Sequence, residues 1–371
     1  MKTMNHILFR TTKLLILSVL MLGSNLAAAQ NLSDQRSVSR SFPATLETTL
    51  EVRNKYGKIQ VVTWEKDSVG VDVDIYLTES SSSRLRKLKE DIKIDFTGTK
   101  TYIIAKTVIE SEIGRLASEI KSIGNTIAGT NKKVEINYMV YVPAHMDVVL
   151  SNKFGDIYMD DLEGQVDIEL SNGVLKANRL EGNSSISLSF ANGMIKSLGS
   201  SAMKLSYSDL TLNEVGQLDL VSKSSKLNVD KVNVVKINSR RDKLYFQQVE
   251  YLYGKSNFTQ VWIFDFLRES DVYMKYGKLT IEHVLPDFSK IYVESDYTDI
   301  TLMFNKEASL AFDILHHRKS VLKLPGNKSL DQESFDGKDH YKTVGSMGPG
   351  EAGGQVNIDA LQKCYINISY K

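Results

Sequence analysis

The sequence predicts an all-β protein, a β-solenoid of about 18 residues per coil with one short amphipathic helical insertion. A pattern of a small or aromatic residue, a turn residue and then apolar–x–apolar recurs after Pro143. Ile157 and Ile300 belong to copies eight intervals apart, so the period is close to eighteen. Apolar and polar residues also alternate within each copy, as in half-buried strands. A fixed period of this size is typical of stacked repeats.

Nine copies can be read, and they begin at Phe154, Asn172, Asn192, Tyr207, Ser224, Arg241, Phe258, Tyr276 and Tyr297. Each coil is expected to hold two short strands, the motif strand and a return strand, with one face inward and the other in water. Apolar residues of successive coils should then lie over one another. We expect Ile157, Leu175 and Ile195 to share one column.

The N-terminus has the pattern of a secretory signal peptide. Lys2, Arg10 and Lys13 precede an apolar run at 14–22, and small residues follow up to Ala29. The run is too short for a spanning helix. We expect residues 1–29 to be removed and the mature protein to reach the periplasm or the cell surface.

The charge of the mature chain is nearly balanced. Residues 1–29 hold three cations and no acid, which leaves 43 Lys and Arg against 45 Asp and Glu, a net charge of −2. This balance argues against a nucleic-acid partner and gives no electrostatic reason to expect an anionic membrane surface. No second apolar stretch of spanning length follows, so we expect no membrane span.

Cys364 is the only cysteine, so the chain has no internal disulfide. It alternates with Ile366, Ile368 and Tyr370 in a terminal strand pattern. Cysteine is among the most buried residue types, and we expect an inert, buried thiol.

Residues 30–150 form an N-terminal β region in this interpretation. Strand patterns occur at 42–78, 92–96, 101–108 and 134–142, and Pro143 ends the last of them. A short helical pattern follows Ser80, with Leu85, Leu88 and Ile92 on one face.

A second helical pattern covers 109–128. Its apolar residues are Ile109, Ile113, Leu116, Ile120, Ile123 and Ile127, at spacings of four and three. The segment spans fewer than three heptads, and glycines weaken it, so it must dock. Docking on its own chain as a lid or end cap, and self-association or binding of a partner protein, are both left open.

The solenoid coils are expected at 151–312. Residues 313–371 are expected to form a flexible Gly-rich loop at 326–354 and closing strands over the far end, which would cover the last coil. These strands carry Val356, Ile358 and the run 364–370.

No catalytic signature is present in the sequence, and we assign no catalytic, cofactor-binding or metal-binding residue. His316 and His317 are adjacent, so on a strand they point to opposite faces and suit a shared metal poorly. Asp156, Asp160, Asp161 and Glu163 contain the oxygen ligands that Ca²⁺ prefers, but their spacing matches no known loop, and a solvated turn is the preferred interpretation.

Outward aromatic residues are the strongest functional signal. They are Tyr158, Tyr245, Tyr251, Tyr253, Trp262, Tyr273 and Tyr292. Aromatic rows on a sheet suit stacking on sugar rings or contact with a protein. Packing between neighbouring strands explains such rows equally well, and the sequence does not decide between these roles.

The run Asn54–Trp64, the strand ending at Val142-Pro143 and the run Asn152–Ile157 with its following coils resemble a known group. This is the bacterial "putative adhesin" family of unknown function, exported proteins with β-strand repeats that are related to auto-transporter adhesin head domains. The resemblance covers roughly 42–312 plus the terminal strand, and departs at 109–127 and 326–354. It implies a right-handed parallel β-helix and supplies no catalytic residues.

The favoured hypothesis is an exported, non-enzymatic β-solenoid that binds a glycan or protein at the cell envelope, without a cofactor. The first alternative is a periplasmic scaffold or envelope-stress accessory protein that acts through the helix at 109–128. The second is a polysaccharide-degrading β-helix enzyme that uses Arg240-Arg241-Asp242. The oligomeric state is left open.

Overall fold

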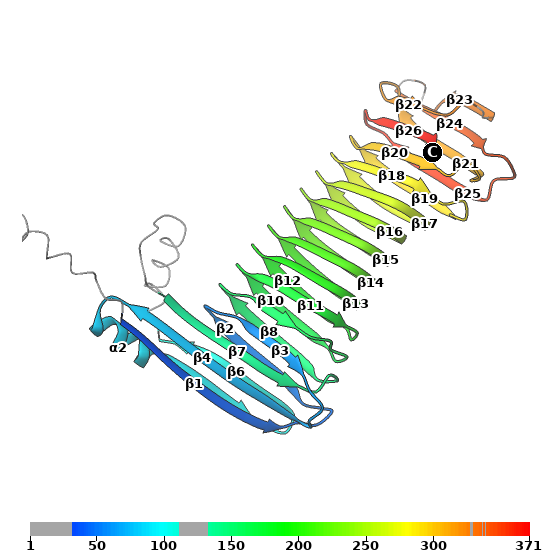
Figure 1. The fold of residues 1–371 in the computed structure, drawn as a ribbon. Coiled ribbons are helices and arrows are strands. Elements are labelled where there is room, and N and C mark those ends of the chain that lie inside the picture. Colours follow the sequence, from blue (N-terminus) through cyan, green and yellow to red (C-terminus); the bar gives the residue numbers. More distant parts are fainter. Residues whose placement is uncertain (1–31, 111–132, 327–328, 336, 338) are drawn as a thin grey trace, which may run out of the picture. The chain divides into compact units, whose positions relative to one another are not determined.

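The computed structural model describes residues 32–110, 133–326, 329–335, 337 and 339–371 (Figure 1). They divide into two compact units. The smaller unit takes its described residues from Met1–Arg36, Ile75–Lys93 and Val108–Glu135. The larger unit comprises Ser37–Asp74, Ile94–Thr107 and Ile136–Lys371.

The smaller unit holds the helix α2 (Ser82–Asp91). Leu88 and Ile92 are buried and Leu85 is half-buried, so the apolar face predicted after Ser80 is confirmed. Asp34 forms an ion pair with Lys89 at 2.7 Å, and Arg36 donates to the carbonyl of Lys89 at 3.1 Å. These contacts hold the start of the first strand against the helix.

Five described strands carry residues of both units: β1 (Leu32–Pro43), β4 (Ser68–Glu79), β5 (Ile92–Gly98), β6 (Tyr102–Ile109) and β7 (Lys133–Val142). The helix expected at 109–128 falls almost entirely on residues 111–132, which lie outside the described residues. None of the helices in the described part is long and apolar enough to cross a membrane.

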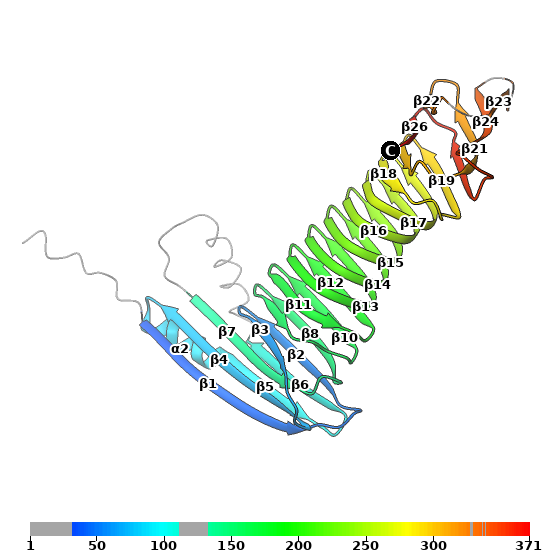
Figure 2. The same ribbon diagram turned by 45° about the vertical axis from the view of Figure 1, so that its right-hand side comes forward.

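The larger unit is a β-solenoid of about nine turns, as predicted (Figure 2). Its first strands are β2 (Thr49–Lys55) and β3 (Ile59–Thr63), followed in the stack by β8 (Asp147–Lys153), β9 (Ile157–Met159), β10 (Val166–Ser171), β11 (Val174–Leu180) and β12 (Ser184–Ser189). Parallel pairing of β2 with β8 and of β3 with β9 makes residues 49–63 a coil of the stack.

The middle coils are built from longer strands than the sequence predicts. These are β13 (Asn192–Ser206), β14 (Asp209–Lys223), β15 (Lys226–Arg240), β16 (Lys243–Asn257) and β17 (Gln260–Lys275). In each, the motif strand and the return strand run together as one, because the ladder to the neighbouring coil continues through the bend between them. After β17 the motif and return strands are separate again, as β18 (Lys278–Val284), β19 (Lys290–Asp296) and β20 (Asp299–Phe304).

The inward residues form columns that run from coil to coil. One column consists of Ile157, Leu175, Gly193, Leu210, Leu227, Leu244, Val261, Leu279 and Ile300. Its members recur at the predicted period, except for a longer last step to Ile300, so the period is confirmed. The side chains of this column are fully buried, apart from Gly193, which has none. They are buried because each coil packs against its neighbours.

The placement of Ile195 in this column was wrong. Ile195 pairs with Ala177, whereas Leu175 pairs with Gly193. The copy assigned to Asn192 starts two residues earlier, at Phe190. The Asn-Gly pair mimics a turn in the sequence, but here it lies within β13, and the turn is made by Phe190 and Ala191.

At one edge of each coil the chain turns through a residue of left-handed backbone conformation. The corner column, as we name these residues, consists of Tyr56, Phe154, Asn172, Phe190, Tyr207, Ser224, Arg241, Phe258, Tyr276 and Tyr297, with φ between 49° and 67°. Side chains that follow the corners point inward in the middle coils. Ser225 Oγ accepts from the Ser208 amide at 3.2 Å, and Asp242 Oδ1 accepts from the Ser225 amide at 2.7 Å. Buried polar side chains thus satisfy the turn amides from one coil to the next.

The C-terminal strands are β21 (Leu310–His317), β22 (Val321–Lys323), β23 (Ser329–Ser334), β24 (His340–Met347), β25 (Gly354–Ala360) and β26 (Tyr365–Tyr370). The expectation that the last strands close the far end was wrong. β25 pairs in parallel with both β19 and β21, and β26 pairs with both β20 and β22. The last coil in the sequence therefore lies between the two coils that precede it. Its Val356, Ile358 and Ile366 are completely buried because both sides of the coil are covered.

The loop expected at 326–354 also needs correction, because it contains β23 and β24. β24 pairs antiparallel with β21 on one side and with β23 on the other. Only Thr343 and Met347 of β24 are buried, so backbone pairing rather than an apolar pattern makes this strand. This hairpin, and not the last strands of the chain, covers the edge of β21.

Candidate functional site

Four of the aromatic residues singled out in the sequence meet on one outward sheet face. Tyr251 and Tyr253 lie on β16, Tyr273 on β17 and Tyr292 on β19. The coil register sets Tyr253 beside Asp271 and Asp271 beside Tyr292, and it sets Tyr273 beside Glu294. We call these four residues the tyrosine face. Residues distant in sequence become neighbours because each coil places its outward residues over those of the coil before.

The tyrosine rings are half-buried and lie among acidic side chains. The rings of Tyr251 and Tyr253 are stacked with centroids 6.4 Å apart and planes 13° apart. Lys290 Nζ lies 5.6 Å from the centroid of the Tyr292 ring. These contacts orient the rings without covering them fully, so part of each ring remains open to solvent.

Two phenol groups are held by carboxylates. Tyr273 donates to Asp296 and Tyr292 donates to Asp359, each at 2.9 Å. The hydrogen bond to Asp359, with burial and nearby acids as further causes, raises the pKa of Tyr292 to about 12. The hydrogen bond to Asp296 raises the pKa of Tyr273 in the same way. Both phenols keep their protons and their orientation at neutral pH.

Other acids of this face have no such partner. Asp271 and Glu294 are exposed, and neither forms an ion pair or a side-chain hydrogen bond within the described residues. Their carboxylates lie next to Tyr253, Tyr273 and Tyr292 in the sheet register. The face therefore combines apolar ring surface with hydrogen-bond acceptors that the protein itself does not use.

The remaining aromatic candidates lie elsewhere and are more firmly held. Tyr245 and Trp262 lie side by side in the opposite half of the coil, with ring centroids 6.4 Å apart. Trp262 Nε1 donates to Glu282 at 3.0 Å, and this bond is the first cause of the lowered pKa of Glu282. Tyr158 donates to Asp156 at 2.9 Å. Packing between neighbouring strands, one of the two roles considered, is observed for Tyr245 and Trp262.

Five exposed rings belong to the corner column, and the sequence interpretation assigned them no role. Phe190, Tyr207, Phe258, Tyr276 and Tyr297 are each 44–61% exposed. Phe190 stacks on Tyr207 with centroids 5.0 Å apart, and Phe258 stacks on Tyr276 at the same distance. The signal that could have revealed them was the aromatic residue at the first position of the repeat. That position was described as small or aromatic, and no binding role was assigned to its ring.

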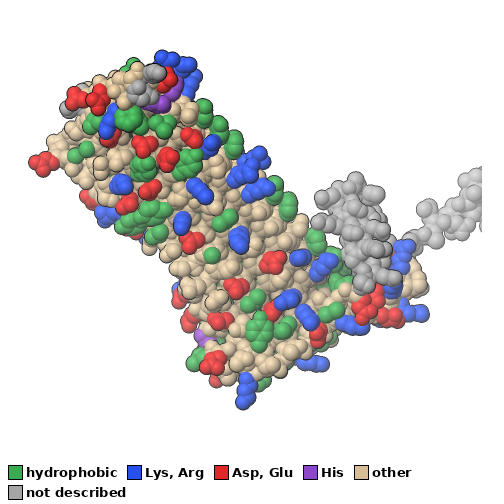
Figure 3. Space-filling model, turned by 180° about the vertical axis from the view of Figure 1, so that it is seen from behind, with side chains coloured by type: hydrophobic (Ala, Val, Ile, Leu, Met, Phe, Trp, Pro, Cys, Tyr) green, Lys and Arg blue, Asp and Glu red, His purple; other side chains and the backbone are tan. Residues whose placement is uncertain are grey.

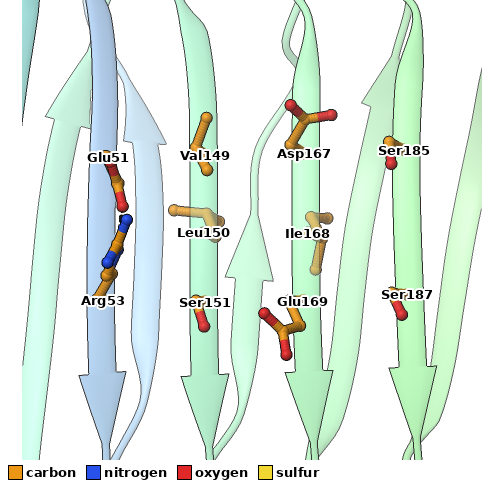
Figure 4. A pocket seen from close by; sticks show the side chains of 10 residues that line it. All are labelled: Glu51, Arg53, Val149, Leu150, Ser151, Asp167, Ile168, Glu169, Ser185 and Ser187. Atoms are coloured by element: carbon orange, nitrogen blue, oxygen red, sulfur yellow. Dashed lines mark hydrogen bonds and ion pairs between the residues drawn. The ribbon is translucent and has the colours of Figure 1, made fainter.

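A shallow hollow lies on the N-terminal coils of the larger unit (Figure 4). Small side chains, Ser151, Ser185 and Ser187, line it together with Asp167 and Glu169. Glu51, which also lines it, is paired with Arg53 and accepts from Tyr102 at 2.7 Å. Across the described part of the chain, His, Cys, Asp and Glu side chains form no group of three or more that could hold a metal ion.

The other residues discussed in the sequence have structural partners. His316 is buried, and its Nε2 lies 3.2 Å from Thr343 Oγ1. Burial lowers the pKa of His316. His317 points to the opposite face of the strand and is less buried. Asp161 binds Arg179, with Oδ2 2.6 Å from Nη2. Cys364 is buried, as predicted, and burial raises the pKa of its thiol.

Arg240, Arg241 and Asp242 do not project into one common site. Asp242 is 2% exposed, and its Oδ2 accepts from Ser222 and Ser239 at 2.7 Å each and from the Arg240 amide at 2.9 Å. This carboxylate points into the corner, while the two arginine side chains are exposed. The Asp242 carboxylate therefore lies in the interior of the coil, whereas the side chains of Arg240 and Arg241 lie in solvent.

Solved structures similar to this chain include two adhesion-related proteins. One is a putative cell adhesion protein from Clostridium sporogenes (12% identity, TM-score 0.19, 91% of this chain and 100% of that one). Another is a putative adhesin from Parabacteroides distasonis (12%, 0.31, 73% and 94%). A putative lipid binding protein from the same organism is also similar (9%, 0.31, 72% and 93%). Two of these proteins share the word adhesin or adhesion in their names with the group that the sequence resembles. No family model matches the sequence, and no curated protein does.

Proposed function

We propose that the protein is an exported, non-enzymatic binding protein that holds a glycan on its tyrosine face, in the manner of an adhesin. Export rests on the signal-peptide pattern of residues 1–29. The observation that carries the glycan proposal is the grouping of Tyr251, Tyr253, Tyr273 and Tyr292 on one open sheet face.

The chemistry of the face suits a neutral sugar chain. A pyranose ring has an apolar C–H face, which packs on a phenol ring, and hydroxyl groups at its rim, which need acceptors. Asp271 and Glu294 offer such acceptors beside the rings. The row extends over several coils about 4.8 Å apart, which favours a chain of sugars over a single one.

The same face gives little support for catalysis. Glycoside hydrolysis needs two carboxyl groups that flank the scissile bond. Here the carboxylates project from an open sheet, and those of Asp296 and Asp359 are occupied by tyrosine hydroxyls. Binding without turnover is the function that this arrangement favours.

A double substitution tests the proposal. Tyr251→Ala/Tyr253→Ala removes two rings that stack on each other and face solvent in part. Immobilised xylan, mannan and β-glucan are the probes. The mature wild-type protein should bind at least one of them, and the variant should lose about tenfold or more in affinity because two ring contacts of about 1 kcal/mol each disappear.

Tyr158→Ala is the matched control, because Tyr158 is also half-buried on the solenoid but lies far along the stack. It should bind as the wild type does. Circular dichroism should give the same strand spectrum for all three proteins. Wild-type protein that binds none of the glycans, or a double variant with unchanged affinity, would overturn the proposal.

A further inference from the structure

Two successive residues in the middle of the corner column are not aromatic. Aromatic stacks end at Tyr207 on one side and begin again at Phe258 on the other, and the two corners between them are Ser224 and Arg241. Tyr207 and Phe258 are 50% and 51% exposed. Three coil steps separate them, about 14 Å at the usual strand spacing. Each is the end ring of its stack, so one face of each ring has no aromatic neighbour.

Five cations surround these two corners. Lys223 and Arg240 precede the corner residues, Lys226 and Lys243 follow them, and Arg241 is itself a corner residue. We call these five residues the basic corner. All are exposed, and none forms an ion pair within the described part of the chain, although Lys223 and Lys226 lie over the rings of Tyr207 and Tyr245. Figure 3 shows basic side chains gathered at one edge of the solenoid, with hydrophobic side chains along the same edge.

The coil register forces these like charges together. Lys223 pairs in register with Arg240, and Lys226 pairs with Lys243. Like charges directly opposite one another in neighbouring strands destabilise a sheet. The carboxylate in this corner, that of Asp242, is buried and directed inward to serine hydroxyls and amides. Asp209 lies beside Lys226 in the register, so one of the five cations has an acidic neighbour. Most of the repulsion is therefore left without an internal counter-charge, and an anion bound from outside would relieve it.

We propose that the basic corner is a second binding site, which takes an acidic polysaccharide. The charges follow the edge from coil to coil, and this arrangement matches a chain that carries an anionic group on successive sugars. The end rings Tyr207 and Phe258 offer apolar surface to sugar faces on either side of the cations. Lys223 Nζ lies 5.8 Å from the centroid of the Tyr207 ring, so a cation and a ring can contact the same sugar. The site lies on the coil edge rather than on the tyrosine face, and the proposal stands independently of that face.

Other polyanions fit the edge less well. Nucleic-acid binding relies on a basic footprint across a domain, but this chain has a net charge of only +1. The five cations are confined to two successive corners. An exposed edge also lacks the enclosing walls that a small free anion needs for tight binding. A charged sugar chain makes use of both the line of cations and the flanking rings.

The test compares polymers that share one backbone. Carboxymethyl dextran and dextran sulfate carry anionic groups, whereas dextran does not. The mature wild-type protein should bind the two charged polymers and not dextran, and its affinity should fall steeply with salt because bound counterions are released. The triple variant Lys223→Gln/Arg240→Gln/Arg241→Gln should bind about tenfold or more weakly, since several charge contacts are lost.

A control variant, Lys176→Gln/Lys196→Gln/Lys231→Gln, removes the same charge from exposed lysines elsewhere on the coils. It should retain wild-type affinity. Equal binding by both triple variants, equal binding to dextran, or tighter binding of single-stranded DNA than of carboxymethyl dextran would each overturn the proposal. Xylan, mannan and β-glucan binding by the Tyr251→Ala/Tyr253→Ala variant is a separate measurement, so the two proposals can fail separately.

Discussion

At the scale of single residues, the corner column is the most unusual feature of this chain. A bulky side chain in the left-handed region is strained, and glycine or asparagine is the usual choice there. Here aromatic residues occupy most corners, including Tyr207, Tyr276 and Tyr297. Stacking offsets the strain, since the rings of Tyr276 and Tyr297 lie 5.1 Å apart and within 5° of parallel. Ser224 and Arg241, like Asn172, have no ring to stack at their corners.

Tyr292 gives a prediction at this scale. Its pKa is raised from 10.0 to about 12, with the hydrogen bond to Asp359 as the first cause. The neutral phenol is therefore favoured in the folded protein. Its contribution to stability is present below pH 10.0 and is lost as the pH rises through about 12.

Titration of tyrosinate absorbance measures this effect. Subtracting the curve of Tyr292→Phe from that of the wild type should isolate one transition near pH 12. Asp359→Asn should move that transition toward 10.0, whereas Asp209→Asn, an exposed aspartate distant in the stack, should leave it in place. A Tyr292 transition that is unchanged by Asp359→Asn would contradict the assigned cause.

At the scale of single elements, close backbone contact at the corners fixes how coils stack. Gly57, Gly155 and Gly173 follow the first three corners. A Cβ added to Gly155 would lie 1.8 Å from the carbonyl oxygen of Gly57, and one added to Gly173 would lie 2.0 Å from that of Gly155. These partners are backbone atoms held by the ladder, so they cannot move aside. The strands β8 and β9 can therefore stack on β2 and β3 only if the residue after the corner has no side chain.

Gly155→Ala should destabilise the larger unit by about 3 kcal/mol, as expected for overpacking that shifts the backbone. Urea unfolding measured by circular dichroism provides the free energy. Gly326→Ala is the control, because a Cβ there meets nothing within 4 Å, and it should change stability by about 0.5 kcal/mol at most. Similar stabilities for the two variants would show that the first coils tolerate a wider spacing.

At the scale of the larger unit, the order of coils in space differs from their order in sequence. The coil of β25 and β26 separates the coil of β19 and β20 from that of β21 and β22. Within the described residues, β21 thus has no parallel partner other than a strand that comes later in the chain. Stability in a solenoid depends on neighbouring coils, so the penultimate coil cannot be stable until the last one has docked.

Removal of residues 354–371 tests this dependence. Amides of β21 should lose hydrogen-exchange protection in the shortened chain because their partner strand is absent. Amides of β14, β15 and β16 should remain protected, since their own neighbours are intact. Protection of β21 equal to that in the full chain would mean that it docks directly on β19, and the dependence would be refuted.

Much of the larger unit follows from periodicity. The coil length, the inward columns and the outward tyrosines are all visible in the sequence, because each depends on residues of one coil at a fixed spacing. The error at Ile195 arose where Asn192-Gly193 imitates a turn, and only pairing with β11 shows that both lie within a strand. The hairpin of β23 and β24 was missed because few side chains of β24 are buried, so its sequence carries no alternation.

The sequence by itself determined that this protein is a stack of coils with a repeat close to eighteen, since the apolar rungs recur along the chain. Only the tertiary structure decided which outward residues become neighbours. The register of three strands places Tyr253 and Tyr292 on either side of Asp271, and the register of two strands places Lys223 beside Arg240. The insertion of the last coil was likewise decided by contacts between segments distant in sequence. Local patterns encode which face a residue takes, whereas pairing between coils sets what lies beside it.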